Sequence, residues 1–230
     1  MTLHIYQARL LHYLTESDRT ERTPSKIANT NQPDHAQVST IDHSTMLLPV
    51  IAGERIYPEY IADGALVVDD VTGRIVEYGR SETILSTYAN AEGKPAVKVH
   101  DYRDKLIMPG FIDTHVHYPQ IDMIAAYGEQ LLDWLNNYTF VTEANFADPK
   151  VAHDTAQFFL NQLLANGTTS AMVFSTSHPL SAEAFFAESH KLNTRMITGN
   201  VLMDQNAPEQ LCIPAEQSIR DTQDIIDNWH

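Results

Sequence analysis

The sequence predicts an α/β protein: a small β-domain followed by the first three β/α units of a TIM-like (β/α)₈ barrel. From about residue 106 onward, short apolar runs alternate with segments of helical periodicity, whereas β-prone runs around glycine turns precede that point. Alternating strands and helices are typical of a parallel sheet covered by helices. We therefore divide the chain into a poorly structured segment or insertion at 1–44, a small β-sandwich-like domain at 45–107, and the opening of the barrel at 108–230.

The amino-terminal region of the chain holds weak and strong β signals. Residues 2–14 fit either a strand or a short helix, and residues 15–44 are rich in Ser, Thr, Asn, Asp and Pro, which is typical of a solvated loop. Thr72-Gly73 supplies a turn between two β-prone runs. The β-prone segments predicted for this domain are 64–70, 74–78 and 97–108.

The carboxyl-terminal region has helix signals at both ends of one segment. Asp148 is a good N-cap and Pro149 a good first helical residue, while Asn166-Gly167 is a typical stop, so a helix is predicted over 150–165. The other elements expected here are a buried strand at 170–175, a helix from Ser181 to about Leu192, a strand at 195–203 and a helix at 215–229.

The most informative stretch is LIMPGFIDTHVHYPQ, residues 106–120, in which an apolar run ends on His115 and His117. Side chains two residues apart on a strand project to the same face, so these two imidazoles can hold one metal ion. Gln120 follows three residues later, at the carboxyl end of the strand, where barrel enzymes place their active sites. Its amide carries a donor and an acceptor, which suits the polar edge of a purine.

This stretch resembles a known family. PGFIDTHVH, residues 109–117, is similar to the first-strand signature of the metal-dependent amidohydrolases. The resemblance narrows to the guanine deaminases and covers about residues 60–230. The further segments that carry it are YPQ (118–120), YGEQLLDWL (127–135), YTFVTE (138–143), NGTTSA (166–171) and VLMDQNAP (201–208).

The resemblance implies a reaction and a site. His115 and His117 would be metal ligands, with zinc the expected ion and iron possible, and His117 and Gln120 would contact the substrate. The reaction would convert guanine and water to xanthine and ammonia, by attack of metal-activated water on C2. The remaining ligands and the glutamate proton shuttle belong to later barrel strands, so we expect an amino-terminal fragment with no catalytic proton shuttle of its own and no autonomous activity. A complete protein of this kind would be a homodimer.

Two other interpretations stay open. The first alternative to guanine deaminase is a deaminase for a related amino-heterocycle, because the metal and the attack by water are shared across the superfamily. The second alternative is a catalytically inert truncated protein. The YGEQLLDWL and YTF segments favour guanine.

Several further residues have a functional and a structural interpretation. Trp134 is either a core anchor or a stacking partner for a flat base, and Asp113 either reaches the metal or braces the pocket. His178 and Asp204 follow predicted strands, where polar residues line barrel sites but also serve as caps and turns. Cys212 fits a buried thiol. The histidines expected to be surface or helical residues are His4, His12, His35, His43, His100, His153 and His190.

Composition excludes several partners and compartments. A formal net charge of −15 argues against nucleic acid and anionic membranes, because both need clustered Lys and Arg. The single cysteine, Cys212, excludes an internal disulfide and the paired-cysteine zinc site of cytidine-type deaminases. The amino terminus lacks a signal-peptide pattern and no apolar run approaches a spanning helix, so a cytoplasmic location is expected.

Overall fold

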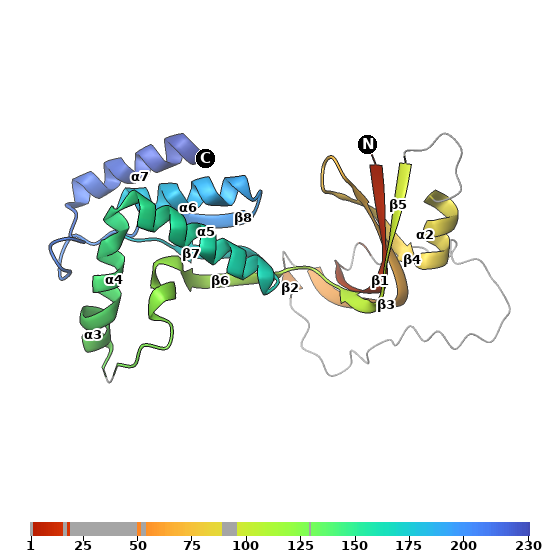
Figure 1. Ribbon diagram of the computed structural model, residues 1–230, viewed down its shortest axis with the longest axis horizontal. Helices are drawn as coiled ribbons and strands as arrows, with labels where there is room; N and C mark the ends of the chain where they lie inside the picture. The colour runs from red at the N-terminus through yellow and green to blue at the C-terminus, as the bar shows by residue number, and fades with distance from the viewer. Residues whose placement is uncertain (1, 16–17, 19–49, 52–53, 89–95, 129) are drawn as a thin grey trace. The chain divides into compact units, whose positions relative to one another are not determined.

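The computed structural model of the chain describes residues 2–15, 18, 50–51, 54–88, 96–128 and 130–230 (Figure 1). It divides into two units, Met1–Pro109 and Gly110–His230. The described residues of the first unit form a mixed β-sheet with a helix packed against it, and those of the second form a parallel sheet with helices, so the chain belongs to the mixed α/β class. None of the helices in the described ranges is long and apolar enough to cross a membrane.

The described strands of the first unit join one sheet in the order β2-β3-β1-β5, with β4 also pairing β3. Strand β1 pairs antiparallel with β3 and parallel with β5. The sequence predicts a sandwich-like domain, but the described residues form this single sheet, against which helix α2 packs. The elements are β1 (Thr2–Thr15), β2 (Val50–Ile51), β3 (Glu54–Asp69), β4 (Ile75–Arg80), α2 (Ser81–Tyr88) and β5 (Ala96–Ile107).

Residues 2–15 differ from the prediction. They form β1, which lies between two strands of the sheet, so the assignment of all of residues 1–44 to a poorly structured segment is wrong for this stretch. Leu3 and Ile5 alternate with more exposed neighbours and pack with Ala65, Val67 and Ile84 in the core of the unit. The partners of β1 are far along the chain, so no local signal could decide between strand and helix. Of the predicted loop at 15–44, residues 16–17 and 19–44 lie outside the described residues.

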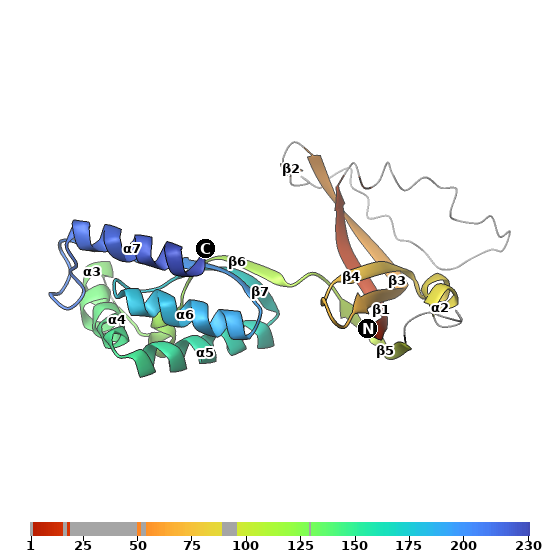
Figure 2. The ribbon, with the colours of Figure 1, turned by 90° about the horizontal axis from the view of Figure 1, so that it is seen from above.

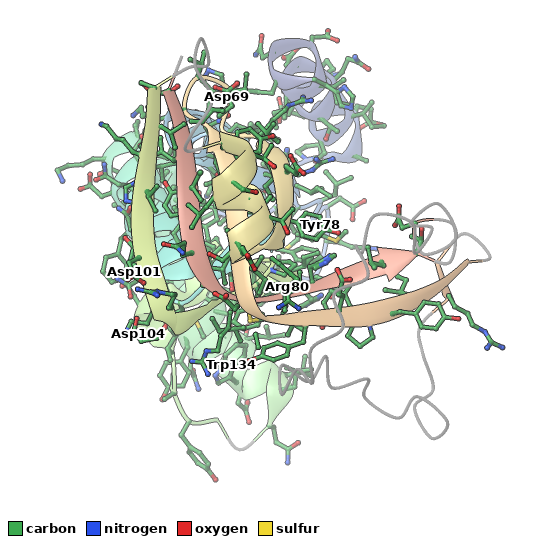
Figure 3. All side chains as sticks on the ribbon, turned by 90° about the vertical axis from the view of Figure 1, so that its right-hand side faces the viewer. Asp69, Tyr78, Arg80, Asp101, Asp104 and Trp134 are labelled. Atoms are coloured by element: carbon green, nitrogen blue, oxygen red, sulfur yellow. The ribbon has the colours of Figure 1, made fainter. Side chains whose placement is uncertain are left out.

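The predicted turn between β3 and β4 is present. The carboxylate of Asp69, labelled in Figure 3, accepts hydrogen bonds from the backbone N–H of Val71 at 3.0 Å and from the hydroxyl of Thr72 at 2.8 Å. Gly73 has φ +66°, a left-handed conformation that favours glycine. A local signal was sufficient here because the turn is held by its own residues.

In the second unit, β6, β7 and β8 form a parallel sheet in that order. Helices α5 and α6 run side by side and contact β7 and β8 respectively, as the two views in Figures 1 and 2 also show. The core between them includes Phe159, Val173 and Phe185. The elements are β6 (Phe111–His117), α5 (Pro149–Ala165), β7 (Thr168–Phe174), α6 (Pro179–Lys191), β8 (Arg195–Gly199) and α7 (Ala215–Trp229).

The helix signals of this unit are mostly confirmed. Asp148 caps α5 by accepting the backbone N–H of Lys150 at 2.8 Å, and Gly167 follows the helix with φ +86°. Helix α6 instead begins at Pro179, two residues before the predicted cap Ser181. The hydroxyl of Ser181 is buried and accepts the backbone N–H of Thr176 at 3.1 Å, so it ties the preceding loop to the helix. Strand β8 ends at Gly199, earlier than the predicted residue 203.

Short helical segments connect β6 to α5 and carry several residues of the candidate site. They are η3 (Tyr118–Met123), α3 (Leu131–Trp134), η4 (Leu135–Thr139), α4 (Phe140–Ala144) and η5 (Asn145–Ala147). Tyr118 and Phe146 anchor this connection, since both are almost fully buried and their rings meet edge to face at 5.3 Å. Gln120 on η3 and Glu143 on α4 are thereby held close together.

Candidate metal and ligand site

The two histidines of β6 lie together as their spacing predicts. The Nε2 atoms of His115 and His117 are 3.3 Å apart, and the ring centroids are 5.2 Å apart. His115 is exposed and His117 is half-buried. Burial, and secondarily the neighbouring His115, lowers the pKa of His117, which favours its neutral imidazole. The neutral ring is the form that binds metal ions.

Phe174, the last residue of β7, packs against both rings. Its ring lies 4.6 Å from that of His117 with an interplanar angle of 12°, and 4.9 Å from that of His115. The parallel pairing of β6 and β7 sets this contact, because His117 and Phe174 are partners in register. Phe174 therefore restricts the orientation of both imidazoles.

Asp113 braces the same strand. Its Oδ1 accepts the backbone N–H of His115 at 3.0 Å. A carboxylate oxygen used in this way holds the local backbone, which fits the bracing role considered from the sequence. Among the described residues no group of three or more His, Cys, Asp or Glu side chains converges as a metal site, so Asp113 does not complete one with the histidine pair.

Gln120 lies beside the histidine pair on η3. Its Nε2 donates to Oε1 of Glu143 at 3.0 Å and is 3.3 Å from Nδ1 of His117. Glu143 is 6% exposed. Burial raises the pKa of its carboxyl above the ordinary value, and the hydrogen bond from Gln120 partly opposes that shift.

A cavity of about 580 Å³ adjoins the histidine pair. His115, His117 and Gln120 line it, together with Trp134 and a mainly apolar wall. Trp134 is half-buried, and its indole N–H donates to the carbonyl of Ala126 at 3.1 Å. The indole is thus fixed at the cavity wall instead of filling a closed core. A cavity of this size, mostly apolar with a few convergent polar groups, suits a small flat ligand.

The remaining candidates do not line this cavity. His178 occupies the N-cap position of α6; its Nε2 is buried without a hydrogen-bond partner among the described residues, and burial lowers its pKa. Asp204 is exposed in the segment after β8. The thiol of Cys212 is partly buried and lies 3.4 Å from the carbonyl oxygen of Ala207.

Sequence reasoning did not single out Glu143 or Phe174. Glu143 lies in a short helical segment, and nothing in its local pattern points to Gln120, which is 23 positions earlier. Phe174 is an apolar residue of a buried strand, and only the register of β6 against β7 places it against the histidines. His4 and His100, expected to be surface or helical residues, lie on strands β1 and β5 and are half-buried, with ring nitrogens 3.0 Å apart.

The family model of the amidohydrolase family matches residues 106–229, more than half of the chain. The matched residues include the histidine strand, Gln120, Glu143 and Phe174. The chain belongs to the amidohydrolase family.

Within this family, the chain is similar to proteins described as guanine deaminases. The chain is 45% identical over 171 residues to guanine deaminase of Escherichia coli K12, covering 74% of this chain and 37% of that protein. It is 37% identical over 169 residues to a probable guanine deaminase of Deinococcus radiodurans, covering 74% of this chain and 38% of the other.

Solved structures agree with this result. The structure of E. coli guanine deaminase matches with a TM-score of 0.74 at 35% identity, over 98% of this chain and 44% of the other. Guanine deaminase from Bradyrhizobium japonicum matches with a TM-score of 0.75 at 28% identity, over 100% of this chain and 42% of the other. A structure from C. acetobutylicum with guanine bound matches at 0.66 and 26% identity, over 98% of this chain and 42% of the other. The chain thus spans about two fifths of the length of these relatives.

Proposed function

We propose that this chain carries the first metal ligands and a substrate-binding residue of a guanine deaminase, which hydrolyses guanine to xanthine and ammonia. One observation carries the proposal: the two Nε2 atoms of His115 and His117 meet at 3.3 Å on the wall of the cavity that Gln120 also lines. The likeness to guanine deaminases over most of this chain supports the choice of substrate.

The histidine pair fits a zinc ion. Two ligands at about 2.0–2.1 Å from a tetrahedral ion are about 3.3 Å apart, which matches the separation of the two Nε2 atoms. Imidazole also suits iron, so the pair does not distinguish the two metals. A bound ion of this kind supplies a water with a pKa near 7 as a nucleophile. Zinc sites use three or four protein ligands, so the others must come from outside the described residues.

The residues of this chain have separate tasks in the proposed site. His115 and His117 hold the metal, with Phe174 and Asp113 fixing their ring and backbone positions. His117, half-buried at the cavity, and Gln120 contact the base. We assign no proton shuttle to this chain, because no described carboxyl joins the histidine pair in a common cluster.

The proposal also covers the fold, the cellular compartment and the oligomeric state of the protein. We propose that β6, α5, β7, α6 and β8 are the start of a (β/α)₈ barrel, which the parallel order β6-β7-β8 with helices α5 and α6 over the sheet supports. The sheet of the first unit would be the small β-domain that precedes it. The net charge of −15 and the single cysteine support a cytoplasmic enzyme that does not bind nucleic acid or membranes. A homodimer is the expected assembly of the whole enzyme.

The test is to produce the chain alone and together with the region of E. coli guanine deaminase outside the matched 171 residues. Ammonia release from guanine is measured with added zinc. We expect no activity from the chain alone, because two ligands hold zinc weakly, and activity from the pair that His117→Ala abolishes. Equal activity with His117→Ala would contradict the proposal. Turnover of another amino-heterocycle in place of guanine would show that guanine is not the substrate. No turnover at all would favour a catalytically inert protein.

A further inference from the structure

Glu143 is a buried carboxyl for which the proposed reaction has no task. It is 6% exposed, on the short helix α4. A buried carboxyl is costly unless it is hydrogen-bonded, and the partner that the described residues provide is Nε2 of Gln120 at 3.0 Å. The two residues come from separate segments, so this bond fixes Gln120 relative to α4.

The bond also determines which end of the Gln120 amide faces Glu143. In the structure the amide nitrogen of Gln120 lies beside a carboxyl oxygen of Glu143, to which it donates. The amide oxygen of Gln120 is then the atom left for a ligand. Gln120 lines the cavity, and no donor to its oxygen is found among the described residues.

The contact between Gln120 and His117 cannot replace this anchor. Nε2 of Gln120 is 3.3 Å from Nδ1 of His117, which accepts a hydrogen bond only while it carries no proton. A neutral imidazole that gives its Nε2 lone pair to a metal carries its proton on Nδ1. The shorter bond to Glu143, at 3.0 Å, does not require an unprotonated Nδ1 on His117.

We propose that Glu143 is a positioning residue that holds the amide of Gln120 with its oxygen toward the cavity, so that the site selects ligands presenting an N–H group. This inference rests on the proposed function, in which the ligand is guanine. The N1–H and the 2-amino group of guanine are donors of this kind. Glu143 acts on the ligand only through Gln120.

A first experiment tests the anchor in the 230-residue chain itself, without ligand or metal. The side-chain amide signals of Gln120 are followed by NMR in the wild type, in Glu143→Gln and in Glu143→Leu. We expect protons that exchange slowly with water in the wild type, similar protection in Glu143→Gln, whose amide oxygen can accept, and fast exchange in Glu143→Leu. Gln162 lines the same cavity and serves as an internal control. Equal protection of Gln120 in the wild type and Glu143→Leu would overturn the proposal.

A second experiment tests the effect on recognition with a double-mutant cycle in the enzyme reconstituted as above. Guanine affinity is measured for Glu143→Leu, Gln120→Ala and the double variant, and zinc affinity and melting temperature are measured in parallel. We expect Glu143→Leu to weaken guanine binding about tenfold or more, as for one hydrogen bond left unmade in a buried site, and to have no further effect in the Gln120→Ala background. Zinc affinity should be unchanged, and Glu143→Gln should recover most of the guanine affinity.

Additive losses in the cycle would show that Glu143 does not act through Gln120. A wild type that binds neither zinc nor guanine would contradict the proposed function instead, and the NMR comparison would still decide the role of Glu143.

Discussion

Among the described residues two pairs of histidines meet, one in each unit. His115 and His117 are two positions apart on β6, with ring nitrogens at 3.3 Å. His4 on β1 and His100 on β5 come from neighbouring parallel strands, with ring nitrogens at 3.0 Å. Distance alone would rank the second pair as highly as the first.

Their surroundings separate the two pairs. His115 and His117 line a cavity and have Phe174 and Gln120 against them. The rings of His4 and His100 instead belong to a row of nearly parallel rings on the sheet with Tyr6 and Tyr102; Tyr6 and His100 have centroids 4.7 Å apart. Among the described side chains, the second pair does not line the cavity that the first pair borders. The comparison explains why we propose a metal at the first pair and not at the second: only the first pair adjoins space for a ligand.

The largest effect expected is on metal binding. In the reconstituted enzyme His115→Ala and His117→Ala should each abolish the zinc content, because each removes one of the three or four protein ligands that a zinc site uses. His4→Ala and His100→Ala are matched controls and should leave zinc binding intact. Metal content after gel filtration of the reconstituted enzyme, and calorimetric titration of the same samples with zinc, measure the difference. Loss of zinc in the His4 or His100 variant, with retention in the β6 variants, would reverse the comparison.

Gln120→Ala should have the next largest effect. It should distinguish a role of Gln120 in guanine binding from a role in metal binding. The variant should keep its zinc and lose about 1–3 kcal/mol of guanine binding, the range for hydrogen bonds left unmade in a buried site. Purine kinetics on the reconstituted enzyme, with metal analysis of the same samples, measure both. A variant that loses zinc would show that Gln120 serves the metal site instead.

Phe174→Ala tests whether the packed ring holds the histidines. Removing the ring frees both imidazoles, and we expect zinc affinity to fall about tenfold, at the lower end for outer-shell contacts. Phe158→Ala, on the exposed face of α5, is the matched control for loss of a phenyl group. Competition with a chelating dye measures the affinities. Unchanged affinity in Phe174→Ala would mean that the strand alone orients the pair.

The sequence was sufficient for features that neighbouring residues determine. The cap at Asp148, the stop at Gly167, the turn at Gly73 and the same-side projection of His115 and His117 all follow from short patterns and are present in the structure. The resemblance to a family added the substrate class, which no local pattern contains.

Features that depend on distant partners could not be predicted. Strand β1 is defined by its pairing with β3 and β5, and the contact between His4 and His100 depends on the same register. The residue type and position of Ser181 fit a helix cap, yet its hydroxyl is bonded inside the unit instead. Glu143 ends the YTFVTE segment, but its contact with Gln120 emerges only when α4 lies beside η3.

The smallest effect expected is on stability with pH, and it tests the burial of Glu143. Burial raises the pKa of this carboxyl in the folded chain above its ordinary value of 4.5. At a pH between 4.5 and the folded-state pKa, the folded state therefore binds more protons than the unfolded state. The stability that Glu143 contributes is therefore fully present below pH 4.5 and is lost as pH rises through the folded-state pKa. Relative to Glu143→Gln, which does not titrate, the wild type should become less stable over that window and then level off.

Urea unfolding at a series of pH values from about 4 to 8 measures the difference in stability. Glu209→Gln, which replaces an exposed carboxylate of the same unit, controls for the lost charge. A wild type that gains stability relative to Glu143→Gln as pH rises would mean that the hydrogen bond from Gln120 outweighs burial. Glu143 would then be a carboxylate held for its charge, which would strengthen its hold on the Gln120 amide nitrogen.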